Sequence, residues 1–141
     1  MSQYLNFFAR HDKEFVPIAD YSRNTVIYDE VVAPYGKLKK FNDHDLETIS
    51  NRLRADKKFA EAQIENINYK MELIFSANNS LEDKLNMANE ELELIESYKN
   101  DIRDCDRYVT ELSFIANMTT DNEIFVGIEV GEPTERDIIE G

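Results

Sequence analysis

The stretch of sequence that decides the fold runs from Leu53 to Ile74 and reads LRADKKFAEAQIENINYKMELI. Apolar residues recur along it at intervals of three, four and seven residues, and only Lys57 interrupts the series. The members of this first stripe are Leu53, Ala60, Ile64, Ile67, Met71 and Ile74. A heptad-like repeat of this kind is typical of a long amphipathic helix that packs against another helix.

The same stretch carries a second apolar stripe on nearly the opposite side of the expected helix. Its members are Ala55, Phe59, Ala62, Tyr69 and Leu73, with Asn66 as the one polar residue. Ala60 and Ala62 belong to different stripes and are two residues apart, which is roughly 200° around a helix axis. A helix that is apolar on two sides needs two packing partners.

Outward from this stretch, neither Gly nor Pro occurs between residues 37 and 126, which permits long helices. Asn42 or Asp43 can cap a first helix, and residues 77–80 predict a tight reversal with Ser80 as the next cap. A second helix is expected over residues 81–117. Its stripes are Leu81, Leu85, Ala88, Leu92 and Ile95 in the first half, and Leu94, Tyr98, Cys105, Tyr108, Leu112 and Ile115 mainly in the second.

The remaining parts of the chain are expected to form a small β-sheet. Residues 14–19 and 25–32 predict strands, and Pro17 restricts the first of them to a sheet edge because proline cannot donate to a ladder. Residues 37–41 are expected to continue briefly extended after a turn. Residues 124–130 predict a C-terminal strand.

These elements predict an α+β fold, mainly α, with a long antiparallel, coiled-coil-like helical hairpin, in a single domain of residues 1–141. Its expected parts are a β-rich N-terminal part (1–41), the hairpin (42–118), a C-terminal strand (119–130) and an acidic tail (131–141). Helices of about 34–37 residues run to roughly 50–55 Å, whereas a compact chain of this length is roughly 37 Å across. We therefore expect the hairpin to project from the β region.

Charge supports an antiparallel register for the two helices. With the reversal centred near residues 78–79, basic side chains of the first helix face acidic side chains of the second. The basic residues are Arg52, Arg54, Lys57 and Lys58, and the acidic ones are Asp101, Asp104 and Asp106. Exposed ion pairs of this kind are worth about 0.2–1 kcal/mol each, so they set the register more than the stability.

A lone hairpin buries one face of each helix and leaves a second apolar set without cover. The residues of this set are Phe59, Tyr69, Leu73, Leu94 and Tyr98. We expect two copies to pair through them, most simply as a twofold homodimer that forms a four-helix bundle. The alternative for the same face is a different protein, and both partners can be accommodated together.

The chain is strongly acidic, because 16 Lys plus Arg stand against 29 Asp plus Glu, a net charge of −13. Residues 61–96, at the tip of the expected hairpin, hold nine acidic and two basic side chains, a net charge of −7. This balance argues against direct binding to nucleic acid or to anionic lipid. The candidate residues for binding a partner at this acidic tip are Glu82, Asp83, Glu90, Glu91, Glu93 and Glu96.

No pattern of residues indicates catalysis, and we expect neither a cofactor nor a metal. His44 and Glu47 have a spacing that one metal ion could use, but no second pair completes such a site. Cys105 lies between two aspartates at a stripe position and is expected to be a small buried hydrophobic residue. No Gly-rich phosphate loop is present, so an enzyme is not expected.

Three functional hypotheses remain. The first is a non-enzymatic protein-interaction module, a scaffold, adaptor or structural component that self-associates through the hairpin. The second is a small acidic inhibitor that mimics the phosphate charge of nucleic acid and blocks a basic nuclease or other nucleic-acid-binding protein. The third is a small-ligand binder at a dimer interface, with a pocket that Arg10, Arg23, Tyr21, Tyr28 and Tyr35 could line.

The sequence also bears on location. It contains no apolar run long enough to cross a membrane, and its first ten residues lack the pattern of a signal peptide, so we expect a cytoplasmic protein. In bulk composition the chain is similar to small acidic inhibitors carried by bacterial viruses, and for such a viral protein the location is the host cytoplasm. Within the acidic tail, Ile138 and Ile139 are expected to dock on the fold if the tail is ordered.

Overall fold

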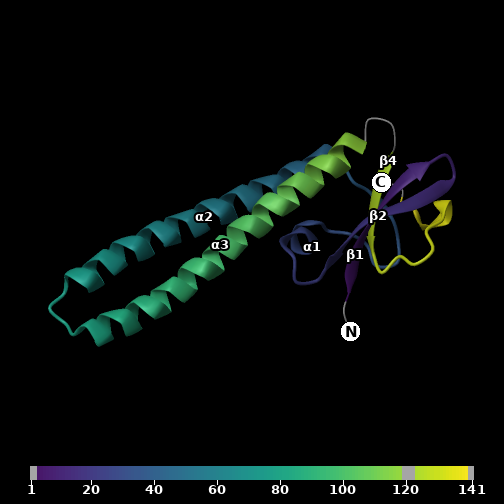
Figure 1. Cartoon of the computed structure of the whole chain (residues 1–141). Helices are drawn as coiled ribbons and strands as arrows, with labels where there is room; N and C mark the ends of the chain where they lie inside the picture. Colours follow the sequence, from purple (N-terminus) through teal and green to yellow (C-terminus); the bar gives the residue numbers. More distant parts are fainter. Residues whose placement is uncertain (1–2, 119–122, 140–141) are drawn as a thin grey trace. The chain divides into compact units, whose positions relative to one another are not determined.

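The computed structural model describes residues 3–118 and 123–139. Its fold is α+β, with two long helices packed against each other and a four-stranded antiparallel sheet, which confirms the predicted class (Figure 1). The elements in chain order are β1 (Tyr4–His11), β2 (Glu14–Ser22), α1 (Val26–Glu30), β3 (Lys39–Lys40), α2 (Asp43–Ser76), α3 (Leu81–Met118), β4 (Glu123–Ile128) and the short 3-10 helix η1 (Glu135–Asp137).

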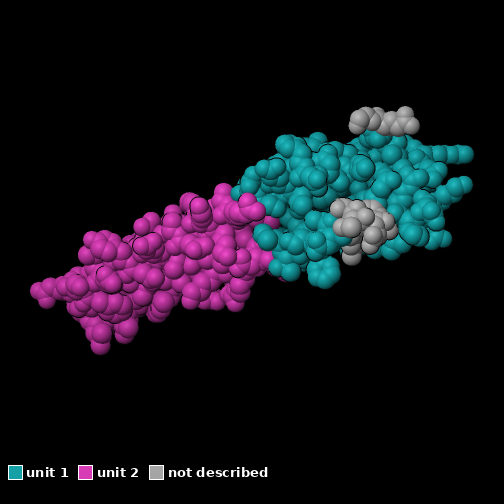
Figure 2. Space-filling view, turned by 90° about the horizontal axis from the view of Figure 1, so that it is seen from above, with its two compact units in different colours: residues 1–52, 108–141 teal, residues 53–107 magenta. Residues whose placement is uncertain are grey.

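The chain divides into two compact units, which Figure 2 shows in different colours. Unit 1 consists of residues 1–52 and 108–141, so it holds the sheet together with the first turns of α2 and the last turns of α3. Unit 2 consists of residues 53–107, which are the rest of the two long helices and the turn between them. Because both units share α2 and α3, this division leaves the predicted single domain untested.

The sheet of unit 1 has the strand order β2-β1-β4-β3, and every neighbouring pair is antiparallel. β2 lies at an edge, as Pro17 predicted, since a proline there costs no ladder hydrogen bond. The central strand β1 was not singled out from the sequence. It pairs on both sides, with Leu5 opposite both Tyr21 and Ile128.

Both faces of the sheet are covered by apolar side chains. On one face Phe7 makes edge-to-face contacts with Tyr21 and Phe41, with ring centroids 5.8 Å and 5.2 Å apart. Tyr21 in turn contacts Tyr108 of α3 at 6.0 Å, and its hydroxyl donates to a carboxylate oxygen of Glu111 at 2.6 Å. The base of α3 therefore covers this face within unit 1.

The second face is covered by the C-terminal segment. A buried cluster of Phe8, Leu38, Phe125 and Val130 receives the partly buried Ile138. The backbone fixes this position, because the Leu38 N–H donates to the carbonyl of residue 137 and the Ile139 N–H donates to the Leu38 carbonyl. The expectation that the tail docks is confirmed for Ile138, whereas the Ile139 side chain is about half exposed.

The predicted strand over residues 25–32 is wrong, because residues Val26–Glu30 form the short helix α1. The Thr25 hydroxyl accepts a hydrogen bond from the Tyr28 N–H at 3.3 Å, which is an N-cap. Ile27 and Val31 are buried and lie four residues apart, which is the spacing of one helical face, while Val32 is exposed. Capping and burial therefore outweigh the β propensity of the branched side chains.

The ends of the long helices agree with the predictions. Asn42 caps α2 through its side-chain oxygen, which accepts from the Asp45 N–H at 2.9 Å, and an Asp45 oxygen accepts in return from the Asn42 N–H at 3.4 Å. Ser80 caps α3, because its hydroxyl oxygen accepts from the Asp83 N–H at 3.2 Å. The predicted extended segment at residues 37–41 and the C-terminal strand correspond to β3 and β4.

Candidate protein-interaction surface

The seam between the two helices of unit 2 follows the first stripe of α2. Leu53, Ala60, Ile67 and Ile74 are each seven residues apart, and each is no more than 7% exposed. A period of seven residues keeps one line of side chains facing the partner helix, as in a coiled coil. The predicted packing face of the first helix is therefore confirmed.

The seam of α3 differs from the predicted stripes. Ala88 and Ile95 are buried as expected, but Leu81, Leu85 and Leu92 of the same predicted stripe are exposed. In the second half, Cys105, Leu112 and Ile115 are buried, which agrees with the prediction. One partner helix can cover only a narrow face, so three of the first-half leucines are left outside the seam.

Glu91, rather than one of these leucines, occupies the seam between Ala88 and Ile95. It is 7% exposed and is the only buried charged or polar residue in the part of the chain that the structure describes. Its carboxylate lies 2.7 Å from the Lys70 ammonium, which itself is largely exposed. Glu91 lies seven residues before Tyr98 and fourteen before Cys105, so the heptad spacing could have identified it as a seam position.

Ion pairs fix the antiparallel register of unit 2. The Lys57 ammonium lies 2.7 Å from an Asp106 oxygen, which confirms one of the predicted pairs. The hydrogen bond to Asp106, followed by the charge of the same carboxylate, raises the pKa of Lys57. Within unit 1, Arg52 pairs with Glu30 of α1 at 2.6 Å, a partner that the sequence did not predict.

We call the five residues predicted for self-association, Phe59, Tyr69, Leu73, Leu94 and Tyr98, the apolar flank. The first four are exposed, by 48–64%, and Tyr98 is half-buried. Phe59 and Tyr98 touch edge to face, with ring centroids 6.4 Å apart, so the α2 and α3 members belong to the same side of the hairpin. Met87 lies seven residues before Leu94 and is also exposed, which extends this side by one residue that the sequence prediction missed.

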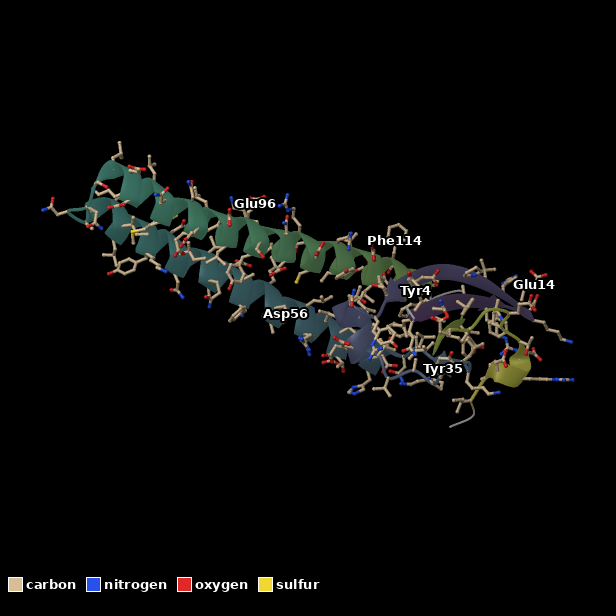
Figure 3. The ribbon with its side chains drawn as sticks, turned by 90° about the horizontal axis from the view of Figure 1, so that it is seen from below. Tyr4, Glu14, Tyr35, Asp56, Glu96 and Phe114 are labelled. Carbon is tan, nitrogen blue, oxygen red and sulfur yellow. The ribbon has the colours of Figure 1, made fainter. Side chains whose placement is uncertain are left out.

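The α2 side of the apolar flank carries no charged side chain over six turns. Its positions, at spacings of three and four, are Ala55, Phe59, Ala62, Asn66, Tyr69, Leu73 and Ser76. The helix surfaces of unit 2, drawn with their side chains in Figure 3, otherwise carry many charged groups. A charge-free strip with exposed aromatic and leucine side chains is typical of a surface that another protein covers.

The candidate residues of the acidic tip are not equivalent. Glu82, Asp83, Glu90, Glu93 and Glu96 are exposed, and Glu96, labelled in Figure 3, pairs with Arg103 at 3.3 Å. Glu91 is buried in the seam and bound to Lys70, so it does not belong to the exposed acidic surface that the other five form.

Cys105 is buried in the seam, as expected of a small hydrophobic residue. Burial raises the pKa of its thiol, and the carboxylates of Asp56 and Asp101 add to this effect. Both causes disfavour the thiolate, which is the reactive form of cysteine.

Of the residues predicted to line a small-ligand pocket, Arg23 and Tyr28 both hydrogen-bond to Gln3, whereas Arg10 and Tyr35 have other surroundings. Arg10 pairs with Glu135 at 2.7 Å, Tyr28 donates to Gln3, and Tyr35 is exposed on the surface. Unit 1 has a hollow of about 370 Å³, but its lining is made by other residues. These are Tyr4, Asn6, Asp20, Glu129, Val130 and Gly131.

Over residues 3–118 and 123–139 no group of three or more His, Cys, Asp and Glu side chains is arranged to hold a metal ion. None of the helices described combines the length and the apolar character needed to cross a membrane. Comparison of the chain with protein-family models, with curated proteins and with solved structures gives no match. The surface of unit 2 therefore has to be interpreted from its own chemistry.

Proposed function

We propose that the protein is a non-enzymatic interaction module that self-associates through the apolar flank of unit 2. In this proposal the paired hairpins serve as a cytoplasmic scaffold or adaptor for a further protein. The observation that carries it is the exposure of Phe59, Tyr69, Leu73 and Leu94 along one side of a hairpin whose own seam is already filled. Exposure of an apolar surface over several helical turns to water is unfavourable, and such a surface is typical of a site that a partner covers.

A second copy is the simplest occupant of the apolar flank. Two hairpins placed flank to flank form a four-helix bundle, and a twofold axis lets one patch serve both copies. Each half-exposed large side chain gains on the order of 1 kcal/mol on burial. The eight large side chains of a dimer supply only part of the burial free energy, because the residues around them are covered as well, and the sum has to exceed an association cost of about 4–15 kcal/mol. We therefore expect a weak dimer with a dissociation constant of about 1–50 μM.

The direct test is the mass of the chain in solution, measured by light scattering for two matched variants. Leu92 and Leu94 are 49% and 48% exposed on the same helix, but their two-residue separation places them on different sides. Leu94→Lys is expected to weaken association at least tenfold, since a charge would enter the interface. Leu92→Lys is the control and is expected to leave association unchanged.

Two outcomes would contradict the proposal. A wild-type chain that stays monomeric at about 0.1 mM would exclude the proposed self-association, because this concentration is above the expected dissociation constant. Loss of association in Leu92→Lys but not in Leu94→Lys would assign the contact to the other side of the hairpin. Circular dichroism checks that both variants keep their helices.

The second candidate function is an acidic inhibitor of a basic nucleic-acid-binding protein, in the host cytoplasm if the protein is viral. It is supported by the exposure of Glu82, Asp83, Glu90 and Glu93 within a segment of net charge −7. The test is whether the immobilised chain captures a basic nucleic-acid-binding protein at low salt, and whether high salt or added DNA prevents this capture. The double variant Glu90→Lys with Glu93→Lys should abolish the capture. Glu14→Lys, in the exposed start of β2, is the control and should not. Capture that survives both the reversal and 0.5 M salt would exclude this function.

A further inference from the structure

The two helices of unit 2 differ strongly in charge. Residues 53–76 of α2 carry four basic and four acidic side chains, so this part of the helix is neutral. Residues 81–107 of α3 carry four basic and nine acidic side chains, a net charge of −5. On the side of the apolar flank, α2 presents its charge-free strip. On α3 the residues neighbouring Met87 and Leu94 include Asp83 and Glu90.

A twofold pair of aligned hairpins that buries this flank has two arrangements. With the two turns at the same end, α2 of each copy lies over α3 of the partner. With the turns at opposite ends, each helix lies over its own counterpart. The second arrangement sets two helical segments of charge −5 against each other, whereas the first sets each of them against a neutral one.

The Lys70–Glu91 pair adds a favourable contact between opposite charges to the first arrangement. Lys70 and Glu91 lie at the same level of the hairpin, because their side chains are 2.7 Å apart. Both are beside the apolar flank, since Lys70 is three residues before Leu73, and Glu91 three before Leu94. With both turns at one end equal levels coincide, so Lys70 of each copy lies over Glu91 of the other.

We infer that the two copies pair with their turns at the same end, α2 on α3 of the partner, and that the Lys70–Glu91 pairs specify this orientation. The inference rests on the proposed self-association. Each Glu91 then shares two ammonium groups, its own and the partner's. A single buried polar layer is a well-attested way of fixing register and orientation in helical assemblies.

Asp83 and Glu90, which neighbour the apolar flank on α3, lie over the neutral α2 of the partner in this arrangement, and three other carboxylates of unit 2 lie away from the flank. Glu61 lies one turn beyond Lys57, on the side of the Lys57–Asp106 pair. Glu82 and Glu96 are fourteen residues apart, and Glu96 pairs with Arg103 rather than with a group near the apolar flank. They therefore face water in the dimer, where salt screens charges more than about 8–10 Å apart.

The test measures the distance between the two turns in the full-length dimer. A spin label is placed at Asn79→Cys in the exposed turn, with Cys105→Ala to remove the natural thiol. Turns at the same end should give a label separation of about 10–20 Å, since packed helices lie about 8–10 Å apart. Turns at opposite ends should give about 40 Å, because the turn is about 20 Å from the middle of the apolar flank.

The outcomes separate this inference from the proposal on which it depends. A monomer by light scattering contradicts the proposed function. A dimer with a separation near 40 Å leaves that function standing and overturns the orientation. In the double variant Lys70→Leu with Glu91→Leu, we expect the dimer to persist and both separations to appear. A single short separation in that variant would show that the polar pair does not specify the orientation.

Discussion

Unit 1 and unit 2 bury their large side chains to very different degrees. Nine large residues in the described part of the chain are less than 2% exposed, and all but Leu53 belong to unit 1. These residues are Leu5, Phe7, Ile27, Leu38, Ile49, Leu53, Leu112, Ile124 and Val126. Unit 2 instead leaves Phe59, Tyr69, Leu73 and Leu94 about half exposed or more.

The difference follows from the number of layers in each unit. The sheet of unit 1 is covered on one face by the base of α3 and on the other by the C-terminal segment. Two helices alone share one seam, so unit 2 has no layer to cover a second apolar side. The sheet of unit 1 therefore has both faces covered within the chain, whereas under the proposed function unit 2 gains its second layer from a partner.

The largest difference between the two units is expected when one phenylalanine in each is replaced by alanine. Phe7→Ala should lower the free energy of unfolding by about 3–5 kcal/mol, because a fully buried ring leaves a cavity. Phe59→Ala should cost less than about 1 kcal/mol for the monomer, since its ring is 59% exposed. Urea unfolding at low protein concentration measures both, and equal losses would contradict the difference between the units.

The next largest effect concerns the cover of the second sheet face. Ile138→Ala should destabilise unit 1 by about 1–3 kcal/mol, since Ile138 is partly buried against Phe8, Leu38 and Phe125. Ile139→Ala is the control and should have little effect, because that side chain is about half exposed. Hydrogen exchange at β3 and β4 measures the local effect, and unchanged protection in Ile138→Ala would show that the segment is not needed as a cover.

A smaller effect is expected at α1. Thr25→Ala removes the hydroxyl that accepts from the Tyr28 N–H and should cost about 1 kcal/mol. Thr25→Ser keeps the acceptor and should stay within a few tenths of a kcal/mol of the wild type. Equal losses of thermal stability in the two variants would mean that packing of Ile27 and Val31, rather than the cap, holds this helix.

The smallest effect is a dependence of stability on alkaline pH through Cys105. Burial raises the pKa of this thiol in the folded chain, so folding favours the protonated form. The corresponding stability is fully present below the unfolded pKa of about 8.5 and is lost as the pH rises through the folded value. Cys105→Ala should flatten the fall in unfolding free energy as the pH rises above about 8.5, and an unchanged slope would contradict the assignment.

The sequence predicts the long helices of this protein better than its sheet. Asn42, Ser80 and the heptad repeat from Leu53 define helix ends and a packing face by local rules, and the structure agrees with them. The segment after Thr25 shows the limit of such rules. Its branched residues favour a strand in isolation, but a cap and the burial of Ile27 with Val31 make it a helix.

The candidate surface was predictable in part. Exposure of the apolar flank follows from counting stripes, because one seam cannot cover two of them. The burial of Glu91 could not be expected from its charge and depends on Lys70, which lies 21 positions earlier in the chain. The choice between Glu91 and Leu92 as the seam residue depends on the rotation of α3 about its axis, which the whole length of the helix determines.

The most direct test of the central claim is sedimentation of the unaltered chain over a concentration series from about 1 μM to 0.5 mM, a range that brackets the expected dissociation constant. The account predicts a shift from 16.5 kDa toward twice that mass, with little weakening at 0.5 M salt, because apolar burial supplies the contact. A mass of 16.5 kDa at every concentration would contradict it and would leave the apolar flank to a different protein.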